Sequence, residues 1–141
     1  MLLALLVNVL IVGAAVVIHY EALYRLTQLI PRLTVPYRFR LLIGVFCALL
    51  AHIAEILLFG LAYHWMHQSE RFGYLQGNFD GSFLASCYFS FTTYTTLGFG
   101  DIEPIGNIRF LVGLEALTGL VLITWTASFM FIEMQRFWRT R

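Results

Sequence analysis

The sequence predicts an all-α membrane protein, in which two spanning helices flank a re-entrant helix and one further membrane helix lies at the N-terminus. Of the 141 residues, 60% are hydrophobic and only 12% are charged, about half the charged share of a soluble domain. Three long apolar stretches are present, and a shorter apolar run lies between the last two. The net charge of +1 excludes the basic surface of a nucleic-acid-binding protein.

The first apolar stretch, residues 1–18, is polar only at Asn8 and is borderline for the ~20 residues that a spanning helix needs. We interpret it as a membrane helix. A segment on the membrane surface or a cleaved signal peptide is the alternative, although the stretch lacks a basic start. Residues 19–40 are interpreted as a basic linker, so that 1–40 precede a second unit at 41–141.

That second unit contains two stretches that clearly qualify as spanning helices. The outer helix is predicted at about 41–67, where only His52 and Glu55 interrupt the apolar run. The inner helix is predicted at about 107–135, where Glu115 is the one charged residue between Phe110 and Ile132.

The arginines predict how the chain crosses the membrane. Four arginines lie in residues 19–40, and three more lie in the tail at Arg136, Arg139 and Arg141. Because arginine-rich flanks stay in the cytoplasm, the linker and the tail are predicted inside. The first helix then crosses from outside to inside, and the N-terminus lies outside.

A short helix is predicted between the two spanning helices. Asp80 or Ser82 can cap its first turn, and residues 83–94 follow without glycine or proline. Twelve residues make a helix of about 18 Å, which crosses roughly half of the hydrocarbon layer. This length predicts a re-entrant pore helix.

Two alternating glycines, Gly98 and Gly100, follow the short helix. Irregular backbone at membrane depth is tolerated only where it is buried in protein or lines a watery path. Alternating glycines permit positive φ, so that successive carbonyls can point the same way. Four such strands around an axis would form rings of carbonyl oxygens that replace the water shell of a cation.

The run Thr96-Leu97-Gly98-Phe99-Gly100-Asp101, after a short helix and between two spanning helices, resembles the pore domain of potassium channels. The resemblance covers about residues 41–136. It implies a homotetramer in the cell membrane that conducts K⁺ passively, with no enzymatic activity and no cofactor besides the permeant ions. Residues 96–100 would form the selectivity filter, Thr96 its innermost hydroxyl ring, and Asp101 would lie at the outer mouth.

Two departures from the family pattern affect the support of this filter. Phe99 stands where tyrosine is commoner, and Tyr88-Phe89 stand where many relatives carry paired tryptophans. These departures concern the rigidity of the filter more than its ion preference. A weakly selective cation channel of the same architecture is the alternative, and the intact Gly98-Phe99-Gly100 argues against it. A transporter subunit is less favoured, since such relatives carry four pore repeats in one chain.

The candidate supporting residues of the filter are Thr92, Thr95 and Glu115. Glu115, Glu55 and His52 are predicted at similar depth, where ionisable groups are costly and usually paired or functional. We expect them to brace the pore helix, or at least to accept hydrogen bonds from its last residues, Thr92, Thr93 or Tyr94. Proton sensing by these groups is an alternative.

The inner helix carries further candidates. Gly119 is a possible hinge, and its alternative is close helix packing. The candidate cavity-lining residues are Thr124, Ala127, Ser128 and Ile132, with lateral packing against the second helix as the alternative.

The histidines allow one rival function. His52, Glu55, His64 and His67 could hold the metal of a membrane metalloenzyme, but His64 and His67 have no third ligand nearby in the sequence. We therefore predict no metal beyond permeating K⁺. Cys47 and Cys87 are interpreted as small core residues.

Overall fold

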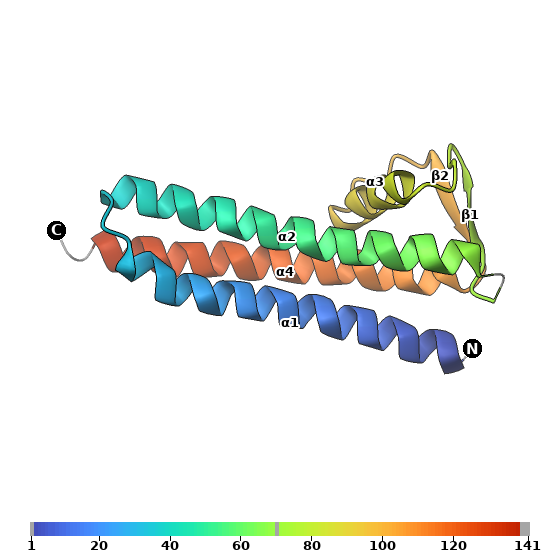
Figure 1. Cartoon of the computed structure of the whole chain (residues 1–141), viewed down its shortest axis with the longest axis horizontal. Coiled ribbons are helices and arrows are strands. Elements are labelled where there is room, and N and C mark those ends of the chain that lie inside the picture. Colours follow the sequence, from blue (N-terminus) through green and yellow to red (C-terminus); the bar gives the residue numbers. More distant parts are fainter. Residues whose placement is uncertain (1, 70, 139–141) are drawn as a thin grey trace.

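Three long helices lie side by side, and a short helix with a pair of strands packs against one end of the second (Figure 1). The structure is a computed structural model that describes residues 2–69 and 71–138. Arg139 and Arg141, which entered the topology prediction, lie outside the described residues. The elements in chain order are α1 (Leu2–Arg32), α2 (Tyr37–Gln68), β1 (Tyr74–Gly77), α3 (Phe83–Tyr94), β2 (Ile102–Ile105) and α4 (Ile108–Trp138). Helices α1, α2 and α4 are each long and apolar enough to cross a membrane.

Helix α1 continues well beyond residue 18, the end of the first apolar stretch. It runs to Arg32, so most of the segment interpreted as a linker is helical. The cause is a second apolar patch, in which Leu23, Leu26 and Ile30 recur at helical spacing and are buried together near Phe129. A helix of 31 residues is about 46 Å long, so that its end with Arg32 extends beyond the ~30 Å hydrocarbon layer.

Helix α3 begins at the predicted cap. The Ala85 amide donates to Ser82 Oγ over 3.0 Å, and the Ser82 amide donates to Asp80 Oδ1 over 2.9 Å. The helix then packs closely on α2 at Gly60, where a Cβ atom would lie only 3.0 Å from Cα of Cys87. This contact sets the position of the pore helix against the outer half of α2.

The antiparallel pair of β1 and β2 was not predicted. Tyr74 lies opposite Ile105 and Gly77 opposite Ile102, so that the strands join the segment before α3 to the segment after it. Each strand has only four residues, and the two strands lie far apart in the chain. No local sequence pattern therefore predicts the pair. The pair holds the two ends of the re-entrant segment together.

The N-terminal end of α1 lies at the same end of the bundle as β1 and β2 (Figure 1). A hollow of about 420 Å³ there is lined by Leu5 and Asn8 of α1 and by Phe110 and Leu114 of α4. The chain direction of α1 is therefore opposite to that of α2, as the predicted topology requires.

Cysteine labelling tests the sidedness of this arrangement. In a background without Cys47 and Cys87, Leu2→Cys should react with an impermeant thiol reagent from outside. Thr34→Cys, in the connection between α1 and α2, should react only from the cytoplasm, because positively charged flanks stay inside. Labelling of Leu2→Cys from the cytoplasm alone would contradict the predicted crossing of α1.

Candidate functional site

The segment after α3 has an alternating backbone conformation. Thr96, Gly98 and Gly100 have φ of +58°, +49° and +76°. Thr96 is the one non-glycine residue with positive φ in the described part of the chain, which costs it about 1–2 kcal/mol. Strain of this kind is typical of functional sites. The predicted filter thus has a backbone that regular secondary structure does not explain.

The amides of this segment are held by the pore helix. The Thr96 amide donates to the Thr93 carbonyl over 2.9 Å, and the Gly98 amide donates to the Thr92 carbonyl over 3.0 Å. Among the described residues, no donor reaches the carbonyls of residues 96–100. Backbone carbonyls normally find a partner, so these are available to a ligand.

The same segment is exposed in the single chain. The side chains of Leu97 and Phe99 are 59% and 64% exposed. A hollow of about 430 Å³ beside them is lined by both glycines of the segment and by Val112 of α4. Phe99 thus lies beside an open hollow, and Leu97 is exposed next to it along the chain.

The hydroxyl of Tyr88 provides a support for this segment that the sequence reasoning missed. It donates to Asp101 Oδ2 over 3.0 Å and so ties the pore helix to the predicted outer mouth. The hydroxyls of Thr92 and Thr95 instead donate to carbonyls of α3 itself, those of Phe89 and Phe91. Thr92 therefore contacts the predicted filter through its backbone carbonyl.

A comparison with known protein families matches residues 51–136 to an ion channel family. The chain belongs to this ion channel family. No curated protein and no solved structure matches it. The match covers α2 from Ala51 onward, the whole re-entrant segment and nearly all of α4, and confirms the resemblance on which the pore-domain prediction rested. Helix α1 of the channel lies outside the match.

Glu115 joins the three helices of the pore domain. Its side chain is fully buried, and it accepts hydrogen bonds of 2.5 Å from Tyr63 of α2 and from Ser90 of α3. For Glu115 the expected partners Thr92, Thr93 and Tyr94 were wrong, whereas Tyr94 does donate to Glu55, as expected for that residue. Ser90 is the α3 residue that faces both neighbours, since its hydroxyl also lies 2.9 Å from the Ile56 carbonyl.

Substitution of Glu115 should separate bracing from proton sensing. Glu115→Leu leaves the buried hydroxyl of Tyr63 without a partner, which costs about 1–3 kcal/mol, and leaves the Ser90 hydroxyl with the Ile56 carbonyl alone. We expect a clear loss of thermal stability in detergent and of ion flux in vesicles. Glu115→Gln retains hydrogen bonding and should stay near the wild type in both. If Glu115→Gln instead abolished a pH dependence of flux at normal stability, Glu115 would be a proton sensor.

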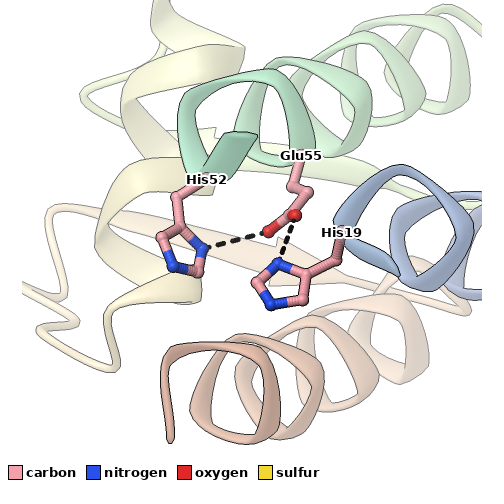
Figure 2. Close-up of side chains that lie close together, drawn as sticks. All are labelled: His19, His52 and Glu55. Atoms are coloured by element: carbon pink, nitrogen blue, oxygen red, sulfur yellow. Dashed lines mark hydrogen bonds and ion pairs between the residues drawn. The ribbon is translucent and has the colours of Figure 1, made fainter. Parts of the chain in front are cut away.

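Glu55 lies at the centre of a second buried cluster (Figure 2). His19 of α1 and His52 of α2 contact its two carboxylate oxygens, and the Tyr94 hydroxyl at the end of the pore helix donates to it. Sequence reasoning paired Glu55 with His52 but missed His19, because residue 19 was assigned to the linker. No signal in the sequence places that turn of α1 beside Glu55.

The other two histidines of the rival metal site lie elsewhere. His67 Nδ1 accepts the Leu75 amide over 3.1 Å, and His64 Nε2 lies 3.0 Å from the Gln68 amide nitrogen. Both interactions are near the β1 end of α2. The proposed grouping of His52, Glu55, His64 and His67 is therefore wrong.

Gly119 is a point of close approach. A Cβ atom there would lie 2.2 Å from the Tyr94 carbonyl oxygen, so that only glycine lets α4 pass the end of the pore helix. The packing explanation thus accounts for this glycine, and a hinge is not needed for it.

The candidate cavity residues lie on an exposed face of α4. Thr124, Ser128 and Ile132 are exposed, and both hydroxyls donate to carbonyls of their own helix. Packing against α2 therefore does not explain these three. Ala127 lies beside them and lines a groove between α2, α3 and α4.

Proposed function

We propose that the channel is a potassium-selective homotetramer of the cell membrane. The observation that carries this proposal is the alternation of positive φ at Thr96, Gly98 and Gly100. Alternation turns successive carbonyls to the same side, and four copies would surround an axis with stacked oxygen rings. Such rings can replace the hydration shell of K⁺.

The exposure of the filter supports assembly from several copies. Leu97 and Phe99 are more than half exposed, and a neighbouring chain would cover them. The hydroxyls of Thr124 and Ser128 face outward on α4, where four copies could line a central cavity. The exposed side chains of Thr124 and Ser128 would then face the inside of the pore.

Conduction would be passive. K⁺ would leave its water shell, pass the hydroxyl ring of Thr96, and move between carbonyl rings by mutual repulsion of neighbouring ions. The carboxylate of Asp101 would attract cations to the outer mouth. The Tyr88 hydroxyl that bonds Asp101 would hold this mouth in place, in a channel that lacks paired tryptophans. No cofactor is needed beyond the permeant ion.

Flux from reconstituted vesicles tests the proposal. Vesicles loaded with K⁺ and diluted into Na⁺ should develop a K⁺ diffusion potential, and barium should block it. Cross-linking of the same preparation should give a ladder that ends at four chains. Equal permeability to K⁺ and Na⁺ would favour the weakly selective alternative, and a ladder that ends at two chains would contradict the tetramer.

A further inference from the structure

We infer that His19, His52 and Glu55 form a binding site for a divalent transition metal of the zinc type, which links α1 to the pore domain. The three side chains come from two helices and point toward one another (Figure 2). Their donor atoms all lie within 4.8 Å of one another. The inference does not depend on the ion that the channel conducts.

The distances suit a metal between these groups. Glu55 Oε1 lies 2.8 Å from His19 Nδ1, and Oε2 lies 3.1 Å from His52 Nδ1. Zinc binds such ligands tetrahedrally at about 2.0–2.1 Å, which places neighbouring ligand atoms about 3.3 Å apart. Small shifts of the side chains are therefore enough. Two imidazole nitrogens favour a zinc-type ion over Ca²⁺ or Mg²⁺, which prefer oxygen ligands.

Hydrogen counting around Thr126 calls for one further positive charge in the cluster, which a metal ion or an added proton can supply. Its Oγ1 lies 3.0 Å from His52 Nε2 and 3.3 Å from His19 Nε2. If both histidines are neutral and donate through Nδ1 to Glu55, both of their Nε2 atoms are hydrogen-bond acceptors. The Thr126 hydroxyl has a single hydrogen and can donate to only one of them. With metal on both Nδ1 atoms, each Nε2–H can donate to Thr126. Metal-bound histidines usually have such an acceptor on the second nitrogen.

A fourth possible donor lies beside the site. The Tyr94 hydroxyl lies 2.9 Å from His52 Nδ1 and donates to Glu55. Its oxygen is therefore close enough to become the fourth ligand of a tetrahedral metal ion. His19 and Glu55 are fully buried, but His52 lines a groove of about 470 Å³ together with Tyr94 and Thr126. The rest of the groove is lined mainly by apolar side chains, so they would surround a bound metal ion. Once bound, it would tie α1 to the last residue of the pore helix.

Zinc titration of the channel tests this inference. The whole chain, purified without a polyhistidine tag and stripped with a chelator, should bind one Zn²⁺ per chain with micromolar affinity or better. Co²⁺ should give the intense visible absorption of a tetrahedral site. His19→Gln should weaken binding at least ~100-fold, and Thr126→Val about 10–100-fold because it removes only the outer acceptor. The matched control His64→Gln should bind like the wild type.

Two results would overturn the site. One is a stripped wild type without saturable Zn²⁺ binding, which would mean that a second proton on one histidine completes the cluster instead. The other is unchanged affinity in His19→Gln and in His52→Gln. The titration of the wild type shows whether the metal site exists even if these variants fail to fold. Zn²⁺ should also raise the melting temperature of the wild type and not that of a folded His19→Gln channel.

Discussion

Replacement of Gly98 by alanine is expected to abolish selective K⁺ flux, while the protein still inserts into the membrane. Gly98 has φ of +49°, and a Cβ atom there would meet nothing within 4 Å of its own chain. The expected loss of flux is therefore caused by backbone strain and not by a steric clash within the chain. Alanine in this conformation costs about 1–2 kcal/mol in each chain, and four chains of a filter would incur it together. The carbonyl would turn away to relieve the strain, and flux in vesicles should fall by at least ~100-fold.

Gly81→Ala is the matched control for this variant. Gly81 also has positive φ, at +79°, with open space around its Cβ position, but it precedes α3 and lies outside the filter. Its alanine variant carries a similar backbone cost and should conduct normally. Selective flux at the wild-type level from Gly98→Ala would remove residues 96–100 from the conduction path.

Replacement of Gly119 by alanine is expected to destabilise the channel strongly. The new methyl group would lie 2.2 Å from the Tyr94 carbonyl oxygen and 3.0 Å from Cγ of the same residue. The end of the pore helix cannot easily move away from α4, because Tyr94 is buried and its hydroxyl is hydrogen-bonded to Glu55. Overpacking of this kind costs about 1–3 kcal/mol. Thermal unfolding in detergent should therefore occur at a lower temperature, and flux should fall.

Gly113→Ala separates this packing effect from helix propensity. Gly113 lies on the same helix, and a Cβ atom there meets nothing within 4 Å. Since alanine favours a helix by about 1 kcal/mol over glycine, the stability of this control should be unchanged or slightly higher. Wild-type stability with altered opening of Gly119→Ala would restore the hinge interpretation.

Much of the pore domain could be predicted because its signals are local. The apolar lengths of α2 and α4 follow from what a membrane requires, and Ser82 caps α3 through atoms three residues apart. The spacing of Gly98 and Gly100 was enough to predict irregular backbone there, although the positive φ of Thr96 was not predicted. In each case the cause and its effect lie within a few residues.

The buried polar contacts depended on how the helices are rotated and placed against one another. Glu115 was recognised as a residue that needs a partner, but the rotation of α3 selects Ser90 over Thr92 or Tyr94. His19 meets Glu55 from 36 residues away, because the apolar patch of α1 continues to Ile30 and carries that turn into the bundle.

Composition, apolar length and glycine spacing therefore determined the membrane helices and the irregular segment after α3, since these depend on the solvent and on local backbone geometry. The partners of Glu115, the close approach at Gly119 and the cluster around Glu55 were decided by the tertiary structure. A buried carboxylate requires hydrogen-bond donors, but only the packing of α1, α2, α3 and α4 determines which side chains can supply them.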